Sequence, residues 1–536
     1  MKNHFYSLCI LFLLGAIGLQ AQVRYLDEVF SEVSVTADVS YGNNISVLEG
    51  PLSVQPLLMD VYSPAGDDAS ARAVVICLHT GSFLPQYLNG QVTGGKRDSA
   101  VVHLCTRLAR MGYVAIAATY RQGWNPTATG AGGQNIRTGT LLNAAYRGIQ
   151  DLRTCIRYLR KTVAEDANSY RINPDKIAVI GQGTGGYISS GAAFLDDFAE
   201  VQLDKFIDLE TSMLYVDTNL VGNLYGTTEK PLCIPNWPSY SSDFQLAVSL
   251  AGALGDASWI DGPTATANEP AYIGVQIPTD PFTPFGNGPV IVPTTGDFVV
   301  NVSGSRTAVD TANVKGVNDV LASINLFTNT LNQKVQANKN VPFQFPGQTA
   351  TTLATENVYP LITPGYRIET APWDWYDISQ MEQEVASFNQ SHGTSINPAT
   401  LQANTLLTNP NMSRAKGLAY IDTVLMFYTP RACAALGLTE CLDALGVVSV
   451  QELVDDHLVE MQVSPNPAGE EIHFRTSPDH PMEEIRVFNL NGLMVQAYPG
   501  INSSQHTMSR RNLPPGIYLA RIRFKEGILT RKIIFH

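Results

Sequence analysis

The chain has few charged residues and a shortage of basic ones. Only 15% of its 536 residues are charged, with 35 Lys and Arg against 48 Asp and Glu, so the formal net charge is −13. Proteins that bind nucleic acid or anionic lipid present an excess of basic residues. The composition therefore argues against both partners and favours a neutral or cationic ligand.

Long hydrophobic runs are absent after the first 21 residues. Lys2 and His4 precede an apolar run over residues 5–19. A cleavage-site pattern that ends in the small residue Ala21 follows, and this order is typical of a secretory signal peptide. No later stretch is apolar over the ~18 residues that span a bilayer. We expect residues 1–21 to be a signal peptide and the exported chain to have no transmembrane span.

Cysteine is scarce, and metal-site spacing is missing. Six cysteines remain after the signal peptide: Cys77, Cys105, Cys155, Cys233, Cys433 and Cys441. An even number in an exported chain is compatible with disulfides, and we expect Cys433 to pair with Cys441 because they are close. The first three are equally expected to be small buried hydrophobes. No His, Cys, Asp and Glu cluster has ligand spacing, so no metal or cofactor is expected.

The body of the chain, residues 22–436, alternates strand and helix signals. Apolar runs at 73–78 and 113–119 have buried-strand length, and 99–111 and 146–163 have helical apolar spacing. The last helix is expected to place Arg153, Arg157 and Arg160 on its polar face. This alternation favours an α/β fold with a mostly parallel sheet covered by helices on both faces.

A serine is missing where a nucleophile would stand. Gly181-Gln-Gly-Thr-Gly-Gly186 follows a predicted strand with the spacing of a G-x-S-x-G elbow, but Gly183 holds the middle position. That conformation is strained for any residue with a Cβ, so glycine fits once no hydroxyl is required. A phosphate loop is the weaker alternative, because the Lys-Ser/Thr ending is absent.

Further motifs surround the elbow in a fixed order. They are Met59-Asp-Val-Tyr-Ser-Pro64, His79-Thr-Gly-Ser-Phe83, Gly112-Tyr113 through Tyr120-Arg121, and Asn173-Pro-Asp-Lys-Ile177. Together they resemble the secreted carboxylesterase and lipase-like branch of the α/β-hydrolase family over roughly residues 41–320. The resemblance implies an α/β-hydrolase fold.

The resemblance also assigns site residues. It implies an oxyanion hole formed by the main-chain N–H groups of Thr184 and of Gly81 or Ser82. The acid position falls on Asp280, before a proline-bearing loop; a buried or loop-capping aspartate is the alternative.

The base is missing from its expected region. No histidine occurs between His103 and His392. The resemblance places the base beyond a strand predicted at 298–305 and a helix predicted at 311–324, and His392, in a polar loop, is the only later candidate in this domain. A triad acts as a unit, so these losses predict an impaired hydrolase.

Two Gly/Thr/Asn-rich stretches, 90–96 and 123–140, follow strands at the carboxyl edge of the predicted sheet, where ligands of α/β folds bind. Trp124, Trp373 and Trp375 are candidates for the wall of a pocket there, with core packing as the alternative. We expect segment 325–415 to be an insertion or cap.

The pattern changes after a linker predicted at 437–461. Short alternating strands are expected at 471–475, 484–488, 516–524 and 529–535, which predicts a small antiparallel β-sandwich.

Motifs in this tail identify it further. They are Val463-Ser-Pro-Asn-Pro-Ala468, Val487-Phe-Asn-Leu-Asn-Gly492, Leu513-Pro-Pro-Gly-Ile-Tyr518 and Arg531-Lys-Ile-Ile534. Residues 462–536 resemble, nearly end to end, the type A C-terminal sorting domain of the type IX secretion system of Bacteroidota. The resemblance implies the secretion machinery as a partner, followed by release or surface attachment. A carbohydrate-binding sandwich is the alternative.

The sequence thus predicts an exported α/β-hydrolase-fold protein of carboxylesterase type. It has lost its nucleophile and binds a small-molecule or glycan ligand, an ester, acyl or glycan fragment, at the old site. One alternative is an active esterase with a displaced nucleophile, for which Thr184, Ser189 and Ser190 are the nearest candidates. A surface structural or adhesive module is the other, and a well-formed pocket beside residues 80–82 and Thr184 would argue against it.

Overall fold

A computed structural model describes residues 22–48, 52–208, 210–263, 269–325, 329–344, 351–363, 367–445, 459–489, 494–511, 513–525 and 527–536. The predicted signal peptide, residues 1–21, lies outside the described residues. No helix within the described ranges is long and apolar enough to cross a membrane.

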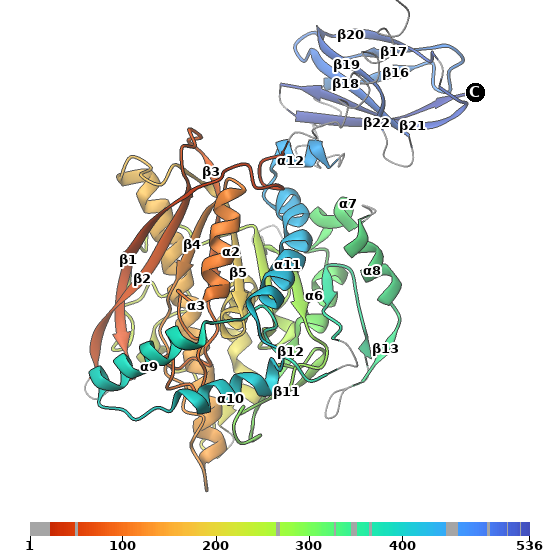
Figure 1. Cartoon of the computed structure of the whole chain (residues 1–536). Coiled ribbons are helices and arrows are strands. Elements are labelled where there is room, and N and C mark those ends of the chain that lie inside the picture. The colour runs from red at the N-terminus through yellow and green to blue at the C-terminus, as the bar shows by residue number, and fades with distance from the viewer. Residues whose placement is uncertain are drawn as a thin grey trace, which may run out of the picture.

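An eight-stranded sheet forms the centre of the body (Figure 1). Its spatial order is β1 (Val33–Ser46), β2 (Ser53–Pro64), β4 (Val114–Ala118), β3 (Arg72–Leu78), β5 (Ile172–Gln182), β8 (Leu246–Leu250), β10 (Ala271–Gln276) and β15 (Val358–Pro360). β2 is antiparallel to both β1 and β4, and all the strands from β4 to β15 pair in parallel. Strand β15 lies in the segment predicted as an insertion or cap, so part of that segment completes the main sheet.

Helices cover both faces of this sheet, which explains why β3 is apolar at every position. Val74, Ile76 and Leu78 pack in one cluster with α3 (Gly133–Glu165) and α4 (Thr184–Phe194). The alternate residues of β3, from Ala73 to Cys77, pack in a second cluster with α2 (Ser99–Arg110) and α11 (Arg414–Ala435). The predicted α/β layering is therefore confirmed.

Helix α3 is longer than predicted and buries two arginines that were expected on its polar face. Arg153 donates to the carbonyl oxygens of Leu224 and Leu195 at 2.8 and 2.7 Å, and Arg157 donates to that of Tyr225 at 2.8 Å. The expectation was wrong because the loops after α4 fold back over this face and present main-chain acceptors to it.

The last predicted strand of the body belongs to a different sheet. β12 (Phe298–Gly304) pairs antiparallel with β11 (Asn287–Ile291) and β9 (Ala253–Leu254). The eighth strand of the main sheet is β15 instead, so the polar loop after β15 occupies the place that the resemblance gives to the base. The other short elements of the body are α5 (Thr218–Val221), α6 (Ser305–Val314), α7 (Ala322–Asn325), α8 (Thr330–Asn338), β6 (Ile207–Asp208), β7 (Met213–Leu214), β13 (Pro342–Phe343) and β14 (Thr351–Thr352).

Helices α9 (Ile378–His392) and α10 (Pro398–Thr408) pack on the loop that follows β3 (Figure 1). Met381 and Leu401 from these helices form a small apolar cluster with Tyr87 and Val92. This cluster joins the loop before α2 to segments about 300 residues further along the chain.

The C-terminal residues form two antiparallel sheets. One contains β16 (Gln462–Ser464), β17 (Glu471–Arg475) and β20 (Gln505–Ser509), and the other β19 (Met494–Ser503), β18 (Met482–Asn489), β21 (Gly516–Phe524) and β22 (Gly527–Phe535). The predicted β-sandwich and its four expected strands are present. The predicted linker carries a helix, α12 (Thr439–Ala444), whose Cys441 forms the expected disulfide with Cys433 of α11.

Candidate functional site

The glycine elbow lies between β5 and α4. Gly183 has φ +52° and ψ −114°, a conformation that costs about 1–3 kcal/mol for a residue with a side chain. Its N–H donates to the carbonyl of Leu250 at 2.8 Å. A Cβ placed on Gly183 would collide with Thr80 Oγ1 and would lie 3.0 Å from Thr80 Cβ. The Thr80 side chain therefore fills the space that a serine at this position would need.

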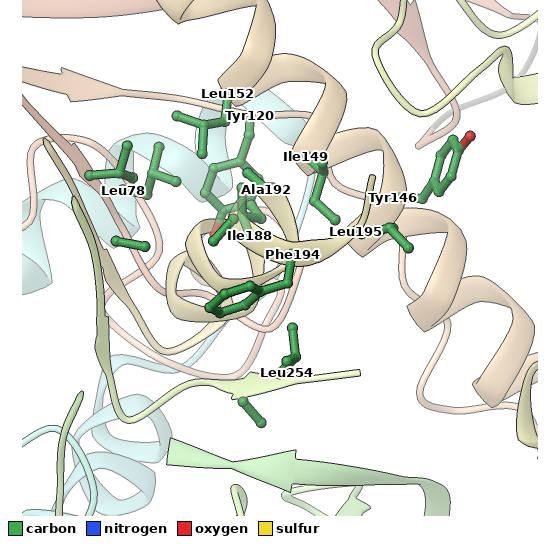
Figure 2. Close-up of a cluster of buried hydrophobic side chains, with 14 of the residues drawn as sticks. Leu78, Tyr120, Tyr146, Ile149, Leu152, Ile188, Ala192, Phe194, Leu195 and Leu254 are labelled. Carbon is green, nitrogen blue, oxygen red and sulfur yellow. The ribbon is translucent and has the colours of Figure 1, made fainter. Parts of the chain in front are cut away.

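Helix α4 is anchored by apolar packing along its length. Figure 2 shows Ile188 of this helix close to Ile149 and Leu152 of α3, whereas Phe194 lies on the side of Leu254. Ile188 and Phe194 are fully buried. The N-terminus of α4, and with it Thr184, is thereby fixed above the end of the sheet.

The loop after β3 faces the elbow with positive φ angles at three successive residues. They are +131° at Gly81, +56° at Ser82 and +50° at Phe83. A Cβ on Gly81 would lie 2.8 Å from Gly94 Cα, so glycine is required for this close approach. In the part of the chain that the structure describes, the N–H groups of Gly81, Ser82 and Thr184 donate to no protein acceptor. These are the three donors expected for an oxyanion hole.

Buried polar groups hold this loop in place. Tyr120 donates to the His79 carbonyl at 2.9 Å, and its hydroxyl is 2.8 Å from Thr184 Oγ1. The His79 ring stacks on Tyr120, and burial lowers the pKa of its imidazole to about 4, so it is neutral at pH 7. The Thr184 hydroxyl is thus engaged by Tyr120.

Asp280 lies in the loop after β10 and is buried. Its Oδ1 accepts from the N–H groups of Phe282 and Thr283 at 2.9 and 3.1 Å, and its Oδ2 accepts from Thr370 Oγ1 at 2.7 Å. Burial raises the pKa of this carboxyl to about 6, against the opposing effect of these three donors. Thr370 lies in the loop after β15, so a threonine hydroxyl, and not a histidine, contacts the aspartate that the sequence predicts at the acid position.

His392 ends α9 on the surface. Its ring is exposed, stacks on Phe388 with centroids 4.1 Å apart, and has Nδ1 2.9 Å from Ser391 Oγ. His392 is not among the residues that line the cavity described next. The structure brings Gly183, Thr184, Gly81 and Ser82 together at that cavity and leaves His392 outside its wall.

A cavity of about 160 Å³ opens beside the elbow. Gly81, Ser82, Gly183 and Thr184 line one part of it. Segment 370–376 and helix α10 line another part. The predicted glycine-rich stretch 90–96 contributes Gln91 and Thr93.

Two of the three candidate tryptophans reach this wall. Trp124 and Trp373 line the cavity, whereas Trp375 lies elsewhere, edge-on to His103 with ring centroids 5.8 Å apart. Sequence reasoning placed Thr80 beside the pocket without foreseeing its contact with the elbow, and it missed Thr370, Asp374 and Tyr376 at this site. The sequence offered one indication only: these residues lie in or next to segments that had already been singled out, such as the motif 79–83 and the pair Trp373 and Trp375.

Ser189 and Ser190 are fully buried inside α4. Ser189 donates to the Val248 carbonyl at 3.0 Å, and Ser190 donates to that of Gly186 at 2.8 Å. Neither lines the cavity. Both hydroxyls therefore satisfy buried acceptors, as back-bonding helix residues do.

Away from this site, the described residues contain one cluster of three carboxylates that lie close enough together to share a cation. Asp196, Glu200 and Asp261 bring carboxylate oxygens within 4.8 Å of one another, and none lines the cavity. Glu200 already accepts from the N–H groups of Asp196 and Asp197.

The strand order, the elbow and the loop after β3 define the class of the body: it has the α/β-hydrolase fold. Residues 59–230 match the family model described as BD-FAE, and residues 462–536 match the one described as a secretion system C-terminal sorting domain. The body of the chain therefore contains a segment similar to esterase-like α/β-hydrolases, and its C-terminal domain is a type IX sorting domain, which indicates secretion to the cell surface or the extracellular space. No curated protein matches the chain by sequence.

Solved structures similar to this chain include esterase 2 of the planctomycete Thermogutta terrifontis. Its propionate-bound form is 16% identical, with 49% of this chain and 78% of that chain covered and a TM-score of 0.28. The form phosphorylated by paraoxon is 18% identical, with 49% and 77% covered and a TM-score of 0.28. At this similarity neither structure carries an argument about the site.

Proposed function

We propose that this secreted carboxylesterase-like protein binds a ligand at the old active site without hydrolysing it. The observation that carries the proposal is the elbow, because Gly183 has no hydroxyl and Thr80 fills the space of the missing side chain. The acid position supports it, since Thr370 and not a histidine donates to Asp280. Loss of both nucleophile and base removes most of what a triad contributes.

What remains of the site suits binding. The N–H groups of Gly81, Ser82 and Thr184 are free to receive the carbonyl oxygen of a small ester, acyl or glycan fragment. The cavity supports a ligand-binding role over a structural or adhesive one. We propose residues 22–436 as the ligand-binding unit.

A fluorophosphonate probe with mass spectrometry tests this proposal. Such probes add covalently to an activated hydroxyl in a hydrolase site. We expect the wild-type chain to stay unlabelled and the variant Thr80→Gly/Gly183→Ser/Thr370→His, which supplies both a nucleophile and a base, to gain label at position 183. Labelling of the wild-type chain at any cavity residue would contradict the proposal.

A second candidate is an active hydrolase that uses Thr80. Its Oγ1 lies beside the vacant nucleophile position and has no hydrogen-bond partner among the described residues. Among the residues that the structure describes, no histidine, lysine or arginine lines the cavity to activate it. A label on the peptide that contains Thr80 would select this candidate.

A further inference from the structure

The cavity beside Gly183 contains one acid and no basic residue. Among the described residues that line it, Asp374 is the only Asp, Glu, Lys, Arg or His. Asp374 is 7% exposed, and its Oδ1 atom is buried without a hydrogen-bond partner. An unpaired buried carboxyl is unfavourable, so a ligand group that pairs with it gains free energy on binding.

The main chain holds Asp374 at the cavity wall. Its N–H donates to the Ala371 carbonyl at 3.0 Å, and its own carbonyl accepts from Asn409 Nδ2 at 3.1 Å. With the backbone fixed on both sides, Asp374 stays in the lining of the cavity.

Aromatic rings surround the same space. The lining includes Phe83, Trp124, Tyr187, Phe282, Trp373 and Tyr376. The faces of such rings attract cations, most strongly where water is excluded. Trp373 Nε1 is also buried without a partner among the described residues.

The protein supplies no counter-ion to Asp374. Burial raises the pKa of its carboxyl well above the ordinary value, and the charge of Asp98, in the loop before α2, acts in the same direction. On the side of α11, Lys416 reaches Asn409 but is 2.9 Å from Glu369, with which it is paired. A positive charge next to Asp374 must therefore come from the ligand.

We propose that this cavity binds an organic ammonium group, a protonated amine, with Asp374 as its counter-ion. The inference rests on the proposed function, because both use the same cavity, and it names the class of ligand. The rest of the ligand would extend toward the N–H groups of Gly81, Ser82 and Thr184. The acidic balance of the chain also favours the approach of a cation.

Calorimetric titration of the mature chain with benzylammonium and with benzyl alcohol tests the proposal. The two probes have similar shapes and differ in charge. We expect benzylammonium to bind at least about tenfold more tightly at about pH 8. Its affinity should rise with pH, and at lower pH its binding should release a proton from Asp374.

Asp374→Asn should lower the affinity for benzylammonium to that for benzyl alcohol. Asp377→Asn makes the same charge change at an exposed residue three positions away and should leave the affinity unchanged. If Asp374→Asn does not fold, proton release by the wild-type chain decides. Absent or equal binding of the two probes, absent proton release, or an unaffected Asp374→Asn variant would overturn the proposal. Hydrolysis by the wild-type chain would contradict the proposed function alone and leave this binding result intact.

Discussion

Thr80 and Gly183 are complementary: the Thr80 side chain occupies the space next to Gly183, the glycine at the nucleophile position of the elbow. A Cβ on Gly183 would meet Thr80 Oγ1, and no other residue supplies the atoms nearest to it. Gly183→Ser alone should therefore destabilise the chain by about 1–3 kcal/mol, through crowding and the strained φ. Adding Thr80→Gly should recover part of this loss.

A double-mutant cycle of chemical unfolding measures this coupling. Thr93→Gly serves as the control, because Thr93 lines the same cavity without approaching Gly183. We expect a coupling of at least about 1 kcal/mol for Thr80 and none for Thr93. Additive effects of the Thr80 and Gly183 substitutions would show that the two positions are independent.

Thr370 stabilises the buried carboxylate of Asp280. Thr370→Val removes the donor to Asp280 Oδ2 and should cost about 1–3 kcal/mol in the free energy of unfolding. The pKa of Asp280 should also rise further above about 6, because this hydrogen bond holds it down. Thr408→Val, at another position of the cavity wall, is the control. An unchanged pH dependence in Thr370→Val would refute this role.

Asp280 should make stability depend on pH. Its pKa in the folded chain is about 6, above the ordinary 3.8, so the folded state binds this proton more tightly than the unfolded state. The contribution of Asp280 to the free energy of unfolding is complete below about pH 4 and falls until about pH 6, by about 3 kcal/mol in all. The measurement is the difference between the unfolding free energies of wild type and Asp280→Asn across this range. A flat difference would mean that the group does not titrate as described.

Lys416 and Glu369 hold the segment that carries Thr370 and Asp374. The Glu369 side chain is 1% exposed, and Lys416 lies 2.9 Å from it. Lys416→Met should cost about 3 kcal/mol, because it leaves a buried carboxylate poorly paired. It should also speed amide exchange in residues 367–376.

Lys339→Met is the matched control for this ion pair. Its partner, Glu356, has a side chain that is 42% exposed, so the expected cost is below about 1 kcal/mol. Equal effects of the two substitutions would contradict a special role for the buried pair.

Much of the fold could be predicted because its signals are local. The apolar run before His79, the strand-to-helix glycines around Gly183 and the turn-separated strands of the tail each occupy a short stretch of sequence. These three local patterns were sufficient to predict the α/β layering of the body and the β-sandwich of the tail. The pairing of Cys433 with Cys441 was predicted for the same reason, since they are only eight positions apart.

The rest of the site depends on contacts between distant segments. Thr370 and Asp280 are 90 positions apart, and Asp374 lies in a loop without periodicity. Thr370 and Asp374 follow strand β15, which has only three residues and ends in a proline. The longer apolar run of β12 was therefore predicted to be the last strand of the sheet. The filling of the elbow by Thr80 depends on the path of two loops, which no local pattern encodes.

Hydrolysis of a short-chain activated ester tests the central claim most directly. The mature wild-type chain would be compared with Thr80→Gly/Gly183→Ser and with the same variant carrying Thr370→His. We predict that wild type shows at most the residual rate that oxyanion donors alone give, about 10³–10⁴ over water, and that Thr80→Val leaves this rate unchanged. The triple variant, which supplies both nucleophile and base, should gain turnover above it. Wild-type turnover that Thr80→Val or Thr184→Ala abolishes would contradict the account.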